Sequence, residues 1–278
     1  MNFRFLLAAI GALALTACPT GPSTSDAGDA GDDENLTITV TGTTSVWPHA
    51  VGYLADAGQT LTLTGLLARV EEPLKVALGD DAGVFGENIL TTAGTYSVSN
   101  IKADRVTLGI AVGILEQEDA GTQRVARAAT VVFDVTLEQG RPRQNIPAAV
   151  AYALPKSYHD ALTAAVGVPF IQMRTTGNPK TDLLGAGFIL GQVVDASGKP
   201  VAGATITSGT TSSSGFVFPK DDFSGTQTST ASHGLFVYVH NGSTVTNFKF
   251  RVAGTGTTYR ERNAGAVKEA GLLVIVSP

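Results

Sequence analysis

Few side chains in this chain are equipped for chemistry: it has one cysteine, four histidines and scattered carboxylates. Cys18, the single cysteine, closely follows an apolar stretch that runs from Phe5 to Leu15. Because the chain has no second thiol, no disulfide can form within it. The folded part must therefore rely on its core for stability.

The segment around Cys18 resembles the processing site of bacterial lipoproteins. Residues 1–17 join a weakly positive start at Arg4 to an apolar stretch about half as long as the roughly 20 residues of a membrane-spanning helix. Leu15-Thr16-Ala17-Cys18 resembles a lipobox, which implies cleavage between Ala17 and Cys18 and lipidation of Cys18 with acyl chains such as palmitate. Lipoproteins of this kind carry three chains, and two or more chains anchor a protein stably. An ordinary secretory signal with a chance cysteine is the alternative.

The residues that follow the cysteine predict a location and a tether. In lipoproteins of this kind, Asp after the cysteine is associated with the inner membrane, so Pro19 favours the outer membrane. Segment 18–35 is acidic, of low complexity and almost without large apolar side chains, and we expect a disordered tether. The net charge is −5 for the whole chain but −1 without residues 1–35. This nearly neutral body lacks the basic surface of a nucleic-acid-binding protein.

The rest of the chain shows the period-two alternation of β-strands. Ile38 and Val40 alternate with threonines, and similar patterns recur at 60–64 and 248–251. Further strands are expected at 74–78, 95–99, 106–115, 129–137, 188–195, 203–208, 235–240 and 272–276, separated by glycine-rich turns. We predict a mainly β fold with two antiparallel β-sandwich domains, 36–147 and 186–278.

A helix is expected between these two domains. Apolar residues recur every four positions from Leu154 to Val166, which gathers them on one helical face. Pro155 suits an early helical position, and Gly167 suits the C-terminal stop. The segment 148–185 is therefore interpreted as a short helix and a connector.

The last third of the chain carries a recognisable order of motifs. An apolar strand from Gly187 leads into the turn Ser197-Gly198-Lys199-Pro200, and Ala231–Tyr238 places Phe236 two residues after Gly234. This order resembles carboxypeptidase regulatory-like domains, although the Asp that usually precedes that glycine is missing. The resemblance implies that 186–278 is a prealbumin-like (transthyretin-like) sandwich. In carboxypeptidases this module accompanies a separate zinc enzyme; elsewhere in bacteria such modules are spacers, adhesion elements or sugar-contacting sandwiches.

A shorter match links the two predicted domains. Thr91–Val98 resembles Ala231–Tyr238 by residue type, because each has an aromatic residue two positions after a glycine and then continues as a strand. This match is a short internal-repeat signal.

No motif in the sequence predicts catalysis, a metal or a cofactor. The histidines lack the convergent spacing of a zinc site, and we expect His159 to be exposed on the helix. Neither a nucleophile elbow nor a phosphate-binding loop occurs. Asp80-Asp81 and Asp221-Asp222 are interpreted as solvated turn residues. We therefore predict a protein that is not an enzyme.

Exposed aromatic rings are the remaining candidates for a binding surface. Trp47 is the candidate ligand-binding residue, since it lies between strand signals and would present a ring to a sugar; the alternative is core packing. The strand 235–239 is apolar on both faces, and we expect it to be covered. Further aromatic candidates for a binding face are Tyr96, Phe216, Phe218, Phe236 and Tyr238.

Together these features predict a non-catalytic, membrane-anchored envelope lipoprotein whose sandwiches bind or space a partner at the cell surface. The partner would be an envelope protein or a polysaccharide. Two alternatives stay open. One is a hydrolase of envelope polymers with an unrecognised carboxylate or histidine site. The other is an accessory lipoprotein of a secretion or motility assembly that pairs through an exposed edge strand.

Overall fold

A computed structural model describes residues 35–117, 121–135, 140–208, 215–241 and 246–278. The predicted lipidation site at Ala17 and Cys18 and almost all of the predicted tether lie outside the described residues. In the described part, strands dominate and the helices are short, so the predicted mainly β fold is confirmed. None of those helices is both long and apolar enough to cross a membrane.

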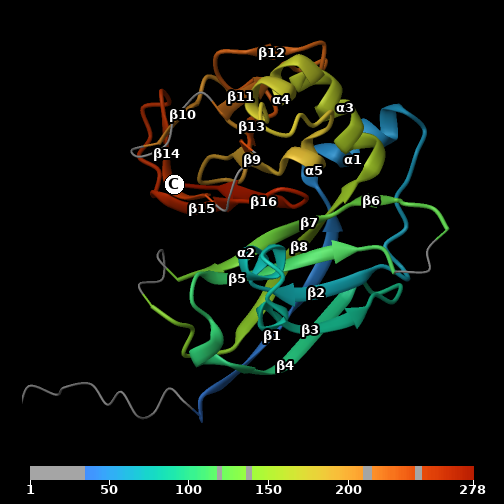
Figure 1. Cartoon of the computed structure of the whole chain (residues 1–278), viewed down its shortest axis with the longest axis vertical. Coiled ribbons are helices and arrows are strands. Elements are labelled where there is room, and N and C mark those ends of the chain that lie inside the picture. The colour runs from blue at the N-terminus through green and yellow to red at the C-terminus, as the bar shows by residue number, and fades with distance from the viewer. Residues whose placement is uncertain (1–34, 118–120, 136–139, 209–214, 242–245) are drawn as a thin grey trace, which may run out of the picture. The chain divides into compact units, whose positions relative to one another are not determined.

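The largest element is a nine-stranded sheet that runs through both halves of the body (Figure 1). Its strands in spatial order are β12 (Thr226–Gln227), β11 (Phe216–Pro219), β13 (Leu235–Val239), β9 (Phe188–Val193), β16 (Gly271–Val276), β7 (Ala128–Asp134), β5 (Gly109–Leu115), β2 (Leu67–Glu71) and β3 (Val84–Ile89). Strands β13 and β9 are buried along their whole length because both of their faces are covered. The expectation of a covered strand at 235–239 is confirmed.

Two smaller sheets pack on this sheet and complete two sandwiches. The N-terminal half of the large sheet consists of β7, β5, β2 and β3. It is covered by β4 (Thr95–Lys102), β1 (Thr37–Val46), β8 (Ile146–Pro155) and β6 (Val125–Ala126), in that order. The C-terminal half consists of β12, β11, β13, β9 and β16, and it is covered by β10 (Thr205–Ser208), β14 (Thr246–Ala253) and β15 (Arg262–Ala266). Ile38 and Val112 are buried in the first core, and Ile189 and Phe250 in the second.

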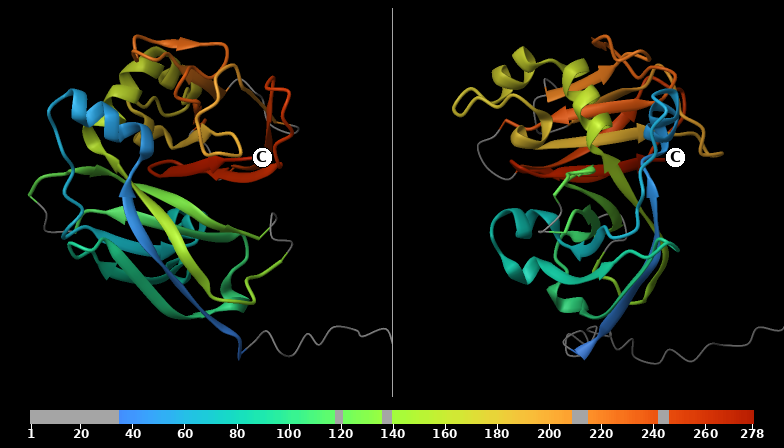
Figure 2. Two further views of the ribbon diagram at one scale, coloured as in Figure 1. Left: turned by 180° about the vertical axis from the view of Figure 1, so that it is seen from behind. Right: turned by 90° about the vertical axis from the view of Figure 1, so that its right-hand side faces the viewer.

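Helices cover the other face of the C-terminal half (Figure 2). They are α1 (Pro48–Asp56), α3 (Lys156–Val166), α4 (Val168–Arg174) and α5 (Leu183–Ala186). The predicted helix is confirmed as α3, although its first two predicted residues belong to β8, and Gly167 ends it with a φ of 87°. A separate short helix, α2 (Pro73–Ala77), and two 3₁₀ turns, Asp81–Gly83 and Ala103–Arg105, belong to the N-terminal half.

The last strand of the chain joins the two halves. β16 pairs in parallel with β9 over Gly271–Val276 and with β7 over Gly271–Leu273. All described residues belong to one compact unit, and the predicted boundary between 147 and 148 falls inside β8. The two sandwiches are therefore parts of one body with a shared sheet.

Two of the strand predictions are wrong. Residues 60–64 pack two leucines on the first core, but two of their carbonyls accept hydrogen bonds from Arg124, at 3.2 and 3.4 Å, instead of from a strand. Residues 74–78 lie mostly in α2, which Pro73 starts because its fixed φ and missing N–H suit the first helical position. Short apolar runs do not by themselves distinguish a strand from a helix.

The two segments matched by residue type form the same turn. Gly94 and Gly234 have φ values of 64° and 70°, and each donates its N–H to the carbonyl three residues earlier at 3.0 Å. The aromatic residue two positions later is buried in both, as Tyr96 in β4 and Phe236 in β13. The repeat signal therefore corresponds to a shared unit of turn and strand.

Candidate functional site

Trp47 lies in the core beneath the helices. Its side chain is fully buried, and its ring meets that of Tyr152 edge-on, with centroids 5.4 Å apart. The ring does not reach the surface, so the prediction of Trp47 as a ligand-binding residue is wrong and the alternative of core packing is confirmed. The other aromatic candidates for a binding face are also buried: Tyr96, Phe216, Phe218, Phe236 and Tyr238.

Helix α1, which starts directly after Trp47, carries two rings that do reach the surface in part. His49 and Tyr53 are one helical turn apart and lie on the same side of α1. His49 Nδ1 lies 2.8 Å from the hydroxyl of Tyr158 on α3, and the rings of Tyr53 and Tyr158 are 5.4 Å apart. A hydrogen bond and ring contacts thus attach α1 to α3.

A tight turn between β11 and β12 adds a third ring. The N–H of Lys220 donates to the carbonyl of Gly225 at 2.9 Å, and the N–H of Phe223 donates to that of Lys220 at 3.0 Å. Phe223 has a φ of 55°, a left-handed conformation that bulky residues seldom adopt. This conformation brings its ring within 5.6–6.1 Å of four others: His49, Tyr53, Tyr158 and His233.

Two aspartates fix this turn. Asp221 Oδ1 accepts from the N–H of Ser232 at 2.9 Å and from its hydroxyl at 2.6 Å, and Asp222 Oδ1 accepts from the N–H of Ser224 at 2.9 Å. These hydrogen bonds lower the pKa of both carboxyls below the ordinary value, so both are ionised at neutral pH. The interpretation of Asp221-Asp222 as turn residues is confirmed.

His49 and His233 form a pair of uncharged imidazoles. Their ring centroids are 4.7 Å apart, and the N–H of Leu235 donates to His233 Nδ1 at 3.1 Å. The proton of the neutral ring therefore sits on Nε2, which lies 3.3 Å from the carbonyl of Lys220. Burial, assisted by His233, lowers the pKa of His49 to about 4, and burial also lowers the pKa of His233.

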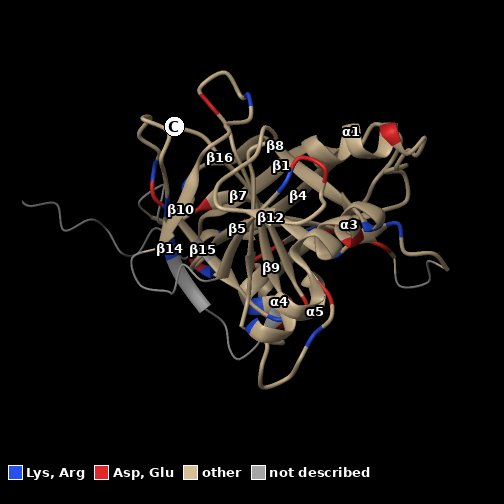
Figure 3. Cartoon of the chain, turned by 90° about the horizontal axis from the view of Figure 1, so that it is seen from above, with Lys and Arg blue, Asp and Glu red and all other residues tan. Residues whose placement is uncertain are grey.

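These elements border an open groove of about 520 Å³, which we call the aromatic–acidic groove. Figure 3 looks down on α1 and α3 and shows the acidic end of α1. Tyr53 and Phe223 supply partly exposed rings, and small residues of the two helices leave the space beside them open. The lining residues are His49, Gly52, Tyr53, Asp56, Ala161, Ala164, Asp221, Asp222 and Phe223.

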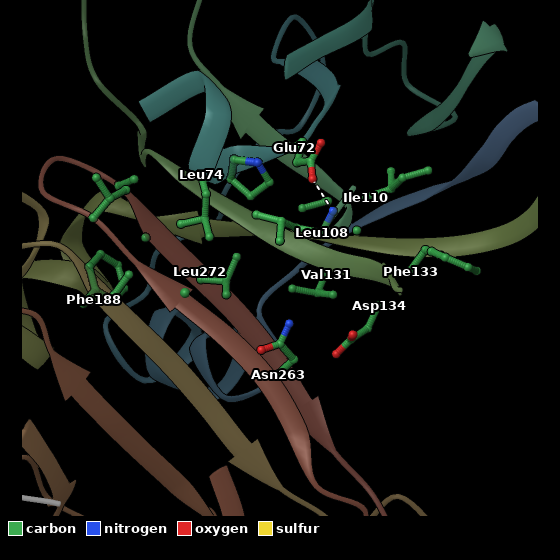
Figure 4. Close-up of a pocket in the computed structure, with 18 residues that line it drawn as sticks. Glu72, Leu74, Leu108, Ile110, Val131, Phe133, Asp134, Phe188, Asn263 and Leu272 are labelled. Atoms are coloured by element: carbon green, nitrogen blue, oxygen red, sulfur yellow. Dashed lines mark hydrogen bonds between the residues drawn. The ribbon is translucent and has the colours of Figure 1, made fainter. Parts of the chain in front are cut away.

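A second cavity lies where α2 covers the junction of the two halves (Figure 4). Its volume is about 70 Å³, and its lining is mainly apolar, with Leu74 from α2, Val131 from β7 and Leu272 from β16. The cavity is therefore much smaller than a typical ligand pocket of about 300–1,000 Å³.

Glu72, at the edge of this cavity, has a structural role. Only 1% of the residue is exposed, and its carboxylate accepts from the hydroxyl of Thr107 at 2.8 Å and from the N–H of Leu108. It also forms an ion pair with Lys75 at 2.7 Å. Glu72 thus connects α2, through Lys75, to Thr107 and Leu108 just before β5.

The two remaining histidines, His159 and His240, are both buried. His159 is only 2% exposed, and its Nδ1 lies 3.1 Å from Asp160 Oδ1, so the prediction of an exposed His159 is wrong. In the part of the chain that the structure describes, no three His, Cys, Asp or Glu side chains gather as a metal site.

The fold and the groove together define a β-sandwich protein with a partly aromatic, acidic surface groove. Sequence reasoning missed the groove residues Tyr53 and Phe223. The four-residue spacing of His49 and Tyr53 was an available signal, whereas nothing in the sequence joins Phe223 to them.

No family model and no curated protein match the chain, so the resemblance to carboxypeptidase regulatory-like domains stays a prediction. The Bacillus anthracis TIE protein aligns over 87% of this chain and 34% of its own, at 10% identity and a TM-score of 0.23. This chain therefore spans about a third of that protein's length. Shaft pilin SpaA from Lactobacillus rhamnosus GG aligns over 87% and 97%, at 9% identity and a TM-score of 0.22. A streptococcal ancillary pilin aligns over 87% and 68%, at 10% identity and 0.22. TM-scores this low do not establish a shared fold, so the fold is described from the chain's own strand pairing.

Proposed function

We propose that the protein is a non-catalytic envelope lipoprotein, anchored through Cys18, whose β-sandwich body binds or spaces a partner at the cell surface. The partner is an envelope protein or a polysaccharide, and the outer membrane is the proposed location.

The shared nine-stranded sheet is the observation that carries this proposal. Since β16 pairs with both β9 and β7, the two sandwiches form one body rather than two modules on a hinge. A single body holds its binding surface in one shape, and the acidic segment 18–35, predicted from the sequence as a tether, would join it to the anchor. This combination suits a spacer or a binding module.

The groups at the aromatic–acidic groove support binding over catalysis. Both nitrogens of His233 face backbone groups, and Asp221 Oδ1 fixes the turn through Ser232. Their hydrogen bonds therefore hold the groove in shape. The partly exposed rings of Tyr53 and Phe223, together with three aspartates, supply contacts for a ligand.

The test of this function is capture from the native envelope. We would isolate the full-length, C-terminally tagged protein from detergent-solubilised envelopes and identify enriched proteins and glycans by mass spectrometry, with an unrelated tagged lipoprotein as control. We expect at least one specific partner. If no protein or glycan enriches over the control, the binding function is wrong.

The anchor has its own test. Cys18→Ser removes the thiol, so we expect the protein to leave the membrane fraction or to remain unprocessed. Unchanged fractionation and an unchanged mass of the N-terminal peptide would contradict the lipid anchor.

A further inference from the structure

The aromatic–acidic groove carries negative charge without a basic residue in its lining. Asp56, Asp221 and Asp222 border it, and no lysine or arginine is among its lining residues. The two neighbouring imidazoles are uncharged at neutral pH. Lys220, the base next to the acidic pair, is exposed, and its charge balances at most one of the three carboxylates. The groove therefore lowers the electrostatic free energy of a cation that enters it.

The rings of the groove favour the same kind of ligand. Tyr53 and Phe223 are partly exposed, with centroids 6.1 Å apart and planes inclined by 35°. Aromatic faces attract cations through their quadrupole. A guanidinium group suits this setting best, because it is planar, stacks on rings and is more weakly hydrated than an ammonium group.

The carboxylates also have acceptor capacity to offer. Asp221 accepts from Ser232 and Asp222 accepts from Ser224, but both carboxylates are exposed, and a carboxylate with about four lone-pair sites can also accept from a ligand. The carboxylate of Asp56 makes no hydrogen bond or ion pair with any residue that the structure describes. A guanidinium group carries five N–H donors, which these oxygens can accept while its plane rests on a ring.

We propose that the aromatic–acidic groove binds an arginine side chain presented by a protein partner. This inference rests on the proposed binding function, since it names the chemistry that the partner brings to the groove. The hydrogen-bonded turn and the left-handed Phe223 hold the rings and carboxylates in place before the ligand arrives, which lowers the entropy cost of binding.

The experiment follows the Tyr53 ring directly. We would label the full-length protein in detergent with 3-fluorotyrosine and assign the Tyr53 signal with Tyr53→Phe. The probes are acetyl-Gly-Arg-Gly-amide, the same peptide with lysine, and the same peptide with citrulline, the uncharged analogue of arginine. We expect the arginine peptide to shift the Tyr53 signal saturably and the citrulline peptide to bind at least tenfold more weakly.

A matched set of variants tests the carboxylates. The double variant Asp56→Asn with Asp222→Asn keeps the acceptor that the turn needs at 222 but removes two charges, and we expect at least tenfold weaker binding of the arginine peptide. Asp81→Asn removes an exposed charge outside the groove and should leave binding unchanged.

Several results would overturn the inference. These are a Tyr53 signal that does not shift, equal binding of the citrulline or lysine peptide, equal binding by the double variant, and tighter binding of a glucosamine trisaccharide. If a partner is captured from the envelope but the arginine peptide fails, the proposed function stands and this inference falls.

Discussion

The imidazole rings of His49 and His233 lie 4.7 Å apart and are inclined by 73°. They come from α1 and from the turn before β13, so this contact joins the first helix of the body to one of its central strands. Because two charged imidazoles at this distance would repel and burial disfavours the charged form of each, the contact is most stable when both are neutral. The structure of the groove is therefore linked to pH.

We expect acid to destabilise the protein through this pair. The folded pKa of His49 is about 4, below the ordinary value of 6.5, so its contribution is complete above pH 6.5 and is lost as the pH falls toward 4. Allowing for screening of the partly exposed ring, the loss is about 1–2 kcal/mol. Urea unfolding from pH 7.5 to 4.5 measures it.

His49→Gln is the control for this pH dependence, since it keeps a hydrogen-bonding group near Tyr158 without a titrating ring. The variant should show a shallower loss of stability with acid. If wild type and variant lose stability in parallel, the histidine pair is not the source.

Phe236 packs on a glycine in the neighbouring strand, and this contact predicts a strong effect. A β-carbon on Gly191 would lie 2.0 Å from Cζ of Phe236, so Gly191→Ala should lower the free energy of unfolding by about 2–3 kcal/mol. Gly52→Ala on α1 meets nothing within 4 Å and should raise stability by about 0.5–1 kcal/mol. Thermal unfolding of the two variants compares them. Equal shifts would contradict the packing described for the β9–β13 pair.

Glu72 is buried and Glu87 is exposed, so we expect their replacement to lower the free energy of unfolding by different amounts. Glu72→Ala leaves the N–H of Leu108 and the charge of Lys75 without their partner, at a cost of about 2–4 kcal/mol. Glu87→Ala breaks an exposed ion pair with Arg69 and should cost less than about 1 kcal/mol. Chemical unfolding curves supply both values. A Glu72 variant as stable as the Glu87 variant would show that Glu72 does not hold α2.

The shared sheet predicts one unfolding transition for the whole body. Since β16 connects the sandwiches through parallel pairing with β7 and β9, neither half keeps its sheet intact when the other unfolds. Calorimetry should give a single peak whose calorimetric and van't Hoff enthalpies agree. Two separate peaks would mean that the halves are independent domains.

Local patterns predicted much of this fold. Alternation located β1 and β14, a run that is apolar on both faces located β13, and the four-residue spacing located α3. The turn at 197–200 also formed as expected: Gly198 has a φ of 80°, and Asp195 Oδ1 accepts from the N–H of Lys199 at 3.0 Å.

The shared sheet and the groove could not be predicted in this way. Pairing of β16 with β7 joins strands from opposite halves, and a strand's sequence pattern shows which face is buried but not which neighbour it has. The groove needs Tyr53 beside Phe223, which only the tertiary structure brings together. For the lone tryptophan, the alternative of core packing is the correct one, because its ring lies in the core under α1.

Photo-crosslinking in the cell tests most directly whether the body binds a partner through the aromatic–acidic groove. Ala164 is exposed and lines the groove, so p-benzoylphenylalanine at position 164 would contact a bound partner. Leu78, 68% exposed and located just after α2, is the matched position outside the groove. We predict a discrete crosslinked protein from position 164 that is absent from position 78 and weakened by Asp56→Asn with Asp222→Asn. No crosslink at 164, or the same products from both positions, would contradict the account.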